Sequence, residues 1–304
     1  MKIYFFENLN ENDWIEAGKQ TFEALNLARR LIDNGVSILD VAEKIEKRFN
    51  PAFPLNISMN EFAAHDTAGI NDDRIIEGVV KVDFGVNVNG AIGDSALTID
   101  LTDKHNELLE ANKSALDDAL NYVMNHFNDV SVHEVGKIIY ENAMRRGFGV
   151  VRNLTGHGLN LNQIHTPPSI YNFPSQSEAR LKPFFAFAIE PFFSYGDAVV
   201  KESGKAKIFQ LISLKPIRDF KARKILNYIH EHYNTNPFAS RWLIDEFREE
   251  EIEFNLMKLV RNGNVHAYAP LRSSNNSIIS QFEHSILLTR DRAIITTKTT
   301  ENHN

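Results

Sequence analysis

Two aspartates lie on either side of a predicted turn. Apolar and polar side chains alternate over residues 79–88, which is typical of a strand with one buried face, and Asn89-Gly90 is a strong hairpin signal before a return strand at 92–99. A two-residue turn pairs positions whose numbers add to 179, so Asp83 and Asp94 lie on one face, about 7 to 8 Å apart as diagonal neighbours. Carboxylates at this distance can hold two metal ions about 3.5 to 4 Å apart.

This interpretation depends on the register. A three-residue loop would put Asp83 and Asp94 on opposite faces, and two solvent-facing acids explain the hairpin equally well when these residues are taken alone. Gly85 and Gly93 lie beside the acids and lack side chains that would crowd an ion, which favours a site over a packed sheet.

Other candidate ligands are far apart in the sequence. His157 lies between two glycines, which let another backbone approach closely, and His165 follows eight residues later. Glu190 and Glu283 interrupt apolar, strand-like segments, where an ionised carboxylate is costly unless it is paired or binds a metal. For either acid alone, a salt bridge to arginine is preferred over a metal.

The remaining pattern predicts a mixed α+β fold. Capping boxes at Ser37 and Ser131 begin two of the helices, and Asn34-Gly35 ends an earlier one. Helices are predicted at 10–32, 37–49, 103–127 and 132–146, with a late helical block at 218–262. Strand-like pieces are predicted at 150–154, 184–193, 198–200, 206–214, 281–288 and 293–297.

Composition excludes several classes of protein and site. The 304 residues include 33 lysines and arginines against 40 acids, a net charge of −7 that argues against DNA as a ligand. With no cysteine, any metal must be bound by oxygen and imidazole. The most apolar run, 184–189, is far shorter than the ~20 residues of a membrane span, and residues 1–14 lack a secretory apolar stretch, so a cytoplasmic protein is expected.

Taken together, these residues resemble the type 2 methionine aminopeptidases in their short, archaeal-like form. The matching segments extend over nearly the whole chain from about residue 18. They are FPLNISMNEFAAH ending at His65, VDFGVNVNGAIGDSALT, LTGHGLNLNQIH, AIEPF, NPFASRWL and QFEHSILL.

The resemblance implies the pita-bread fold, a curved antiparallel sheet covered by helices with a metal site on its concave face. It implies a single catalytic domain, 1–304, interrupted at about 216–264 by a helical insertion with a winged-helix look, because Glu283 lies 93 positions after Glu190. Packing against the catalytic domain is the expected role of this insertion.

The resemblance also implies the chemistry. Two divalent ions, Mn²⁺, Fe²⁺, Co²⁺ or Zn²⁺, would activate a bridging hydroxide that removes the initiator methionine of nascent peptides when the second residue is small. The implied metal ligands are Asp83, Asp94, His157, Glu190 and Glu283. Glu190 is also the implied proton shuttle, and His65 and His165 would contact the scissile amide. The implied apolar pocket residues, which would bind the thioether, are Phe53, Ile164, Phe192 and Tyr268.

Two other functions stay open. An Xaa-Pro aminopeptidase would use similar ligands but usually has a sizeable domain before the first of them, whereas 82 residues precede Asp83 here. A non-catalytic pita-bread binding protein would have a degraded metal site. The family leads us to expect a monomer, and a basic stretch between residues 201 and 224 suggests transient contact with ribosomal RNA.

Overall fold

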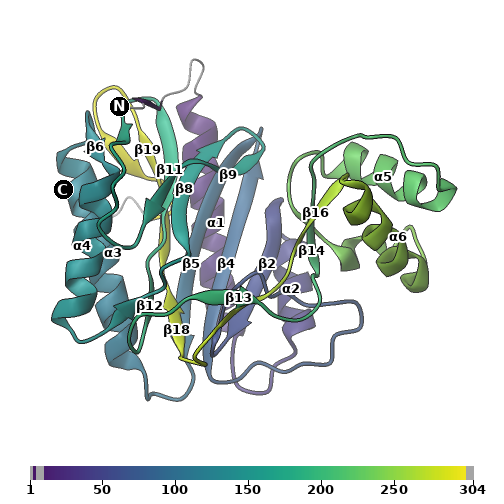
Figure 1. Cartoon of the computed structure of the whole chain (residues 1–304), viewed down its shortest axis with the longest axis horizontal. Coiled ribbons are helices and arrows are strands. Elements are labelled where there is room, and N and C mark those ends of the chain that lie inside the picture. The colour runs from purple at the N-terminus through teal and green to yellow at the C-terminus, as the bar shows by residue number, and fades with distance from the viewer. Residues whose placement is uncertain (1–2, 5–9, 299–304) are drawn as a thin grey trace.

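A curved antiparallel sheet forms the centre of the molecule in the computed structural model, which describes residues 3–4 and 10–298 (Figure 1). Its strands follow the order β2-β4-β5-β19-β11-β8-β9, and β20 pairs with part of β19. Their bounds are β2 Pro51–Met59, β4 Val79–Val88, β5 Ala91–Asp100, β8 Thr155–Asn160, β9 Gln163–Tyr171, β11 Phe185–Ile189, β19 Glu283–Leu288 and β20 Ala293–Ile295. The late strand β19 lies between β5 and β11, which come from much earlier in the chain.

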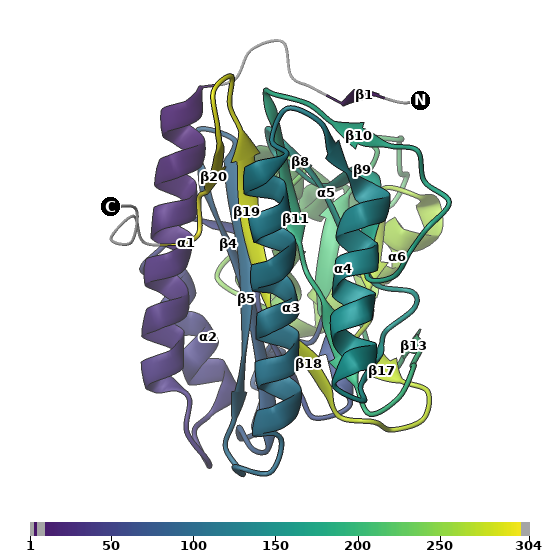
Figure 2. The ribbon, with the colours of Figure 1, turned by 90° about the vertical axis from the view of Figure 1, so that its left-hand side faces the viewer.

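Long helices cover one face of this sheet (Figure 2). These are α1 Glu11–Leu31, α2 Ile38–Glu46, α3 Asn106–Asn125 and α4 Val132–Arg145. As predicted, Ser37 and Ser131 begin α2 and α4, since their hydroxyls accept hydrogen bonds from the backbone N–H groups of Asp40 and Glu134. Buried apolar side chains of α1 and α2 pack on β2 and β4, and those of α3 and α4 pack on β11 and β19.

The β4–β5 hairpin has the predicted register. Val88 pairs with Ala91, Asp83 pairs with Ala96, and Gly85 pairs with Asp94. Asn89 and Gly90 have φ angles of 52° and 92°, so the turn is the left-handed kind that Asn-Gly favours. Both aspartates therefore lie on one face of the sheet.

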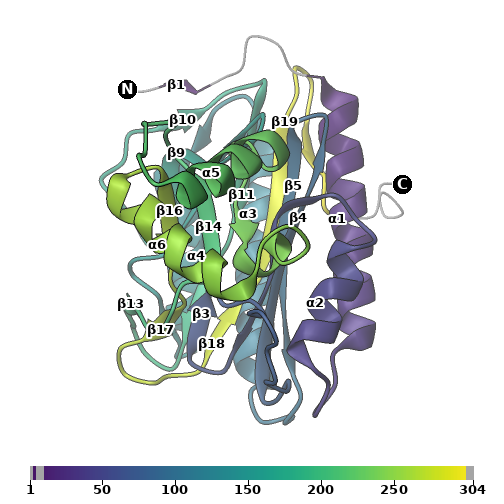
Figure 3. The same ribbon diagram turned by 90° about the vertical axis from the view of Figure 1, so that its right-hand side faces the viewer.

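A separate group of elements lies over the other face (Figure 3). We call residues 207–268 the helical unit. It contains β14 Ile208–Leu211, α5 Phe220–His232, β15 Phe238–Ala239, a 3₁₀ turn Ser240–Leu243, α6 Glu249–Asn262 and β16 Val265–Tyr268. β14 pairs with both β15 and β16, and α5 and α6 pack on them around a core of their own. The helical insertion predicted at about 216–264 falls inside this unit, and its division from the catalytic domain stays a prediction.

Short strands join the remaining segments. They are β1 Ile3–Tyr4, β6 Val130–Ser131 and β10 Arg180–Leu181 in one sheet; β3 Phe62–Ala64, β13 Val200–Glu202 and β17 Leu271–Ser273 in a second; and β7 Gly149–Val150, β12 Phe192–Ser194 and β18 Ile279–Gln281 in a third. Within the described residues, no helix has the length and apolar character needed to cross a membrane.

The structure differs from the predicted elements in several places. Strand β8, which carries His157, lies just after the piece predicted at 150–154, of which only the first residue belongs to a strand, β7. The strands β2 and β9 were not predicted, because prolines at 51, 54, 167 and 168 argue against regular structure. The predicted strand at 184–193 is two strands, β11 and β12, which Glu190 and Pro191 separate.

Candidate metal centre and substrate pocket

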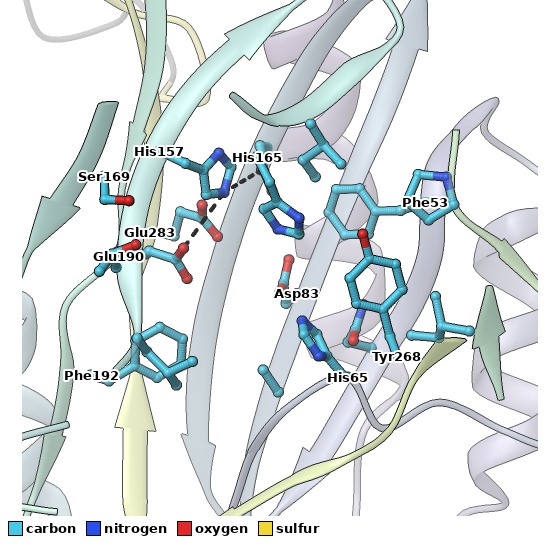
Figure 4. A pocket seen from close by; sticks show the side chains of 18 of the residues that line it. Phe53, His65, Asp83, His157, His165, Ser169, Glu190, Phe192, Tyr268 and Glu283 are labelled. Carbon is cyan, nitrogen blue, oxygen red and sulfur yellow. Dashed lines mark ion pairs between the residues drawn. The ribbon is translucent and has the colours of Figure 1, made fainter. Parts of the chain in front are cut away.

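A cavity of about 360 Å³ lies between the sheet and the helical unit. All the site residues predicted from the sequence line it (Figure 4). They are Phe53, His65, Asp83, Asp94, His157, Ile164, His165, Glu190, Phe192, Tyr268 and Glu283. The cavity thus brings together residues that lie up to 230 positions apart in the sequence.

The central strands place the candidate metal ligands. Ala96 of β5 pairs with Asp83 of β4 on one side and with Glu283 of β19 on the other. His157 of β8 pairs with Ala188 of β11. Glu190 follows directly after β11, at the point where Pro191 ends that strand.

The ligand atoms lie within reach of a shared ion. One ligand atom each of Asp94, His157 and Glu283 lies within 4.8 Å of the other two. His157 Nε2 lies 3.7 Å from Asp94 Oδ2 and 3.5 Å from Glu190 Oε1 (Figure 4). Its Nδ1 faces the backbone oxygen of Gly158 at 3.2 Å, which leaves Nε2 free to face the carboxylates.

The four carboxyl groups have raised pKa values. Loss of water contact raises the pKa of Asp83 to about 7. Burial, with repulsion from neighbouring carboxylates, raises the pKa values of Asp94, Glu190 and Glu283 well above their usual range. Burial lowers the pKa of His157, so its ring is neutral and has a lone pair to offer an ion.

These residues fit divalent cations. Asp83 Oδ1 and Glu283 Oε1 are buried and have no hydrogen-bond partner. Among the described residues, no lysine or arginine forms an ion pair with any of the four carboxylates. The predicted alternative for Glu190 and Glu283, a salt bridge to arginine, is therefore wrong. Buried acids without cationic partners need another source of positive charge, and oxygen and imidazole donors suit Mn²⁺, Fe²⁺, Co²⁺ or Zn²⁺.

The glycines beside the ligands act differently from one another. A Cβ on Gly156 would lie 2.4 Å from the backbone oxygen of Ala188, so this glycine allows β8 to approach β11 closely, as predicted. The interpretation of Gly93 was wrong, because a Cβ there would clash with the backbone of Ala17 in α1, so this glycine serves helix packing. A Cβ on Gly85 would clash with the ring of Phe53, which lines the cavity, so the role predicted for Gly85 stays a prediction.

Two histidines lie beside the ligands. His65 and His165 have φ angles of 61° and 59°, and their ring centroids are 6.4 Å apart. The rings of His165 and His157 are 4.6 Å apart and nearly perpendicular. Burial, followed by the charge of other histidines, lowers the pKa of His65 to about 3. His165 is partly open to solvent, and the charge of His266 lowers its pKa, so both rings are neutral at pH 7 and can each donate one hydrogen bond.

Comparison with known proteins identifies the family. The model of metallopeptidase family M24 matches residues 14–215. A methionine aminopeptidase of Archaeoglobus fulgidus is 42% identical over 93% of this chain and 97% of its own length. The chain belongs to metallopeptidase family M24. The Archaeoglobus relative confirms the predicted resemblance to the type 2 methionine aminopeptidases.

Solved structures of similar fold support this assignment. A thermophilic Arx1 has a TM-score of 0.81 at 16% identity, covering 94% of this chain and 90% of its own. A methionine aminopeptidase of Thermotoga maritima has a TM-score of 0.67 at 22% identity, covering 97% of this chain and all of its own. The curved antiparallel sheet with outer helices is therefore the pita-bread fold of family M24, as predicted, and this family uses a divalent metal.

Gln281 lies beside the candidate ligands but was not predicted from the sequence. Its Nε2 lies 3.4 Å from Asp83 Oδ2 and 3.4 Å from Glu190 Oε2, so it joins two carboxylates that no cation bridges. The signal was present in the QFEH motif, where Gln281 precedes Glu283 by two positions, as a residue on the same face of a strand does.

Apolar side chains also line the cavity, beside the candidate ligands. Phe53 comes from β2, Ile164 from β9, Phe192 from β12 and Tyr268 from β16. The Tyr268 hydroxyl donates to Gln210 at 2.5 Å, which fixes the ring against His65, whose centroid is 5.1 Å away. The helical unit therefore supplies part of the pocket wall.

Proposed function

We propose that this protein is a methionine aminopeptidase that removes the N-terminal methionine of peptides whose second residue is small. The single observation that carries the proposal is the joining of two features in one cavity of about 360 Å³. Buried carboxylates without cationic partners line one side, and aromatic and aliphatic side chains line the other. Family membership and the methionine aminopeptidase relative support the same reaction.

We assign the metal ligands as two sites. Asp83 would hold one ion, His157 and Glu190 the other, and Asp94 and Glu283 would bridge both. When bound, divalent ions supply Lewis acidity and lower the pKa of a coordinated water. Four ionised carboxylates would balance two divalent charges, which suits the absence of lysine or arginine partners described above.

The remaining polar residues act on protons and on the peptide. Glu190 is placed to take the proton from the attacking water and to pass it to the leaving amine, since its carboxyl borders the ligand cluster, 3.5 Å from His157 Nε2. The neutral rings of His65 and His165 can each donate a hydrogen bond to the scissile amide as charge develops on its oxygen.

The apolar wall suits an unbranched thioether. Aromatic rings such as those of Phe53, Phe192 and Tyr268 contact methionine sulfur favourably, by about 0.3 to 1.5 kcal/mol each. Leucine has a branched Cγ that cannot follow the same path. We expect the second residue to be small because the chain resembles the methionine aminopeptidases, which have this preference.

Release of the first residue tests the proposal. The metal-reconstituted protein should release methionine from Met-Ala-Ser at least about tenfold faster, as kcat/KM, than leucine from Leu-Ala-Ser, because an ill-fitting branched side chain costs about 1 to 3 kcal/mol in a defined pocket. Equal cleavage of the two peptides would contradict the assigned specificity.

The same assay addresses the alternatives. Cleavage of Xaa-Pro peptides with methionine peptides uncut would favour an Xaa-Pro aminopeptidase. If no peptide is cleaved after reconstitution with any of several metals, and the protein holds no stoichiometric metal, a non-catalytic binding protein is favoured.

The cellular setting is also proposed. We expect a cytoplasmic monomer that meets peptides as they leave the ribosome. The side chains of Lys215, Arg218, Arg223 and Lys224 are exposed at the start of the helical unit, whereas Lys207 of the same basic stretch is paired with Asp66.

Charge reversal tests ribosome contact. Changing these four exposed cations to glutamate should reduce co-sedimentation with ribosomes at low salt, because contacts with phosphate depend on cationic side chains. Reversing two exposed cations elsewhere, Lys44 of α2 and Arg48 in the turn that follows it, serves as a control. Unchanged pelleting of the first variant would rule out this contact surface.

A further inference from the structure

The backbone of His65 is not stabilised by its own segment. His65 follows β3 with a φ of 61°, in the left-handed region that is unfavourable for a residue with a Cβ, and residues 65–68 belong to no helix or strand. Other parts of the chain must therefore hold this segment in place.

Asp66, the next residue, lies between two cations. Its backbone oxygen accepts a hydrogen bond from the N–H of Ile57 at 2.7 Å. Arg74 Nη1 lies 2.7 Å from one carboxylate oxygen, and Lys207 Nζ lies 2.9 Å from the other. The carboxylate is only 4% exposed, so these charged hydrogen bonds fix its orientation.

Arg241 of the helical unit holds the two residues after Asp66. Its Nη1 donates to Thr67 Oγ1 at 3.1 Å and to the backbone oxygen of Ala68 at 2.7 Å. Its Nη2 pairs with Glu46 of α2, and both of these side chains are about 95% buried. A buried ion pair tolerates little displacement, because moving one partner away leaves an uncompensated charge.

We propose that the helical unit is the positioning element for His65, and that it acts through Lys207 on Asp66 and through Arg241 on Thr67 and Ala68. Neither Lys207 nor Arg241 lines the cavity. The unit thus fixes both the backbone of His65 and, through Tyr268, one side of its ring. This inference rests on the proposed function, which places His65 at the scissile amide.

A double-mutant cycle tests the positioning role. Lys207→Met should lower kcat for Met-Ala-Ser about tenfold with little change in KM, because a displaced His65 loses its contact to the developing charge and not to the bound peptide. Lys207→Arg, which keeps the charge, should restore most of the rate. Since Lys207 acts through His65, adding Lys207→Met to His65→Ala should lower the rate no further.

Lys205→Met is the matched control. Lys205 is two residues away, its side chain is 84% exposed, and it pairs with Glu253 at 3.5 Å on the surface. We expect the kcat of the Lys205→Met variant to equal that of the wild type. Metal content and thermal unfolding are measured for every variant, and Lys207→Gln replaces Lys207→Met if the latter does not fold.

The imidazole NMR signals provide a readout that does not depend on turnover. With the His65 signal assigned by its loss in His65→Ala, Lys207→Met should shift that signal and Lys205→Met should not. The inference would be overturned if Lys207→Met left the His65 signal unchanged. It would also be overturned if Lys207→Met lowered kcat equally in the wild type and in His65→Ala. The two proposals can fail separately. If the wild-type protein releases no methionine, the proposed function is refuted. If Lys207→Met still shifts the His65 signal in that case, the positioning role is supported.

Discussion

Replacing Glu190 with alanine will lower the rate of methionine release by about 10³-fold or more. Glu190 is assigned two tasks, as a metal ligand and as the carrier of a proton, and general acid–base catalysis alone contributes about 10² to 10⁴. Its carboxyl lies 3.5 Å from His157 Nε2 and 3.4 Å from Gln281 Nε2, so the substitution removes a group from the middle of the candidate ligand cluster. Steady-state release of methionine from Met-Ala-Ser measures the effect.

Two further variants separate these tasks from general damage. Glu190→Gln keeps the size of the side chain but cannot carry a proton, so it should retain some metal and still lose most turnover. Glu202→Ala removes an exposed acid of β13 and should leave the rate unchanged. A rate for Glu190→Ala within tenfold of the wild type would disprove the assigned role.

Removal of metal will abolish activity and will lower stability by an amount that grows with pH. In the stripped native protein, the pKa of Asp83 is about 7, and the pKa values of the other three carboxyl groups of the cluster lie well above their usual range. In the unfolded chain, all four carboxyl groups titrate near about 4. From about pH 4 upward, the stripped native protein therefore binds more protons than the unfolded chain, and the cluster's contribution to the free energy of unfolding falls as pH rises through the raised pKa values.

Bound metal replaces these protons, so the loaded protein does not lose this stability. The difference in Tm between loaded and stripped protein should widen as pH rises from about 5 to about 8, as calorimetry can measure. Burial also lowers the pKa values of His65 and His284, and the charge of His266 lowers that of His165, but these histidines act alike in both forms and cancel in the difference. Asp94→Asn should narrow the gap, and a gap that does not change with pH would show that the metal binds elsewhere.

The sequence predicted the parts of the site that depend on local rules. Period-two alternation and Asn89-Gly90 were sufficient to give the register that places Asp83 and Asp94 on one face, because turn geometry fixes a hairpin over its whole length. The capping boxes at Ser37 and Ser131 likewise depend on neighbouring residues alone.

Two of the missed strands, β2 and β9, share a physical reason. β2 and β9 are the two outermost strands of the sheet order, and both contain prolines. Proline lacks the N–H that a central strand needs, but an edge strand has one side without a partner, so proline is tolerated there. Position in the sheet is a property of the whole fold, and local sequence does not reveal it.

Long-range contacts explain the other gaps. Gln281 joins Asp83 to Glu190 only because β18 lies beside the ligand strands, and Gly93 is small because α1 crosses β5 there. The roles of Lys207 and Arg241 depend on segments that lie more than 100 residues apart in the chain. Such contacts follow from tertiary packing and not from spacing along the chain.

The position of β19 has a consequence for biosynthesis. This strand, near the end of the chain, is the only link in the sheet order between β2-β4-β5 and β11-β8-β9 among the described strands, and it contributes Glu283. While the ribosome is still making the chain, the two halves can form their own hairpins, but they cannot join until β19 has emerged and inserted between them. Closing such sequence-distant pairs is slow compared with local folding. The candidate ligand set, which includes Glu283, can therefore come together only after β19 has been translated.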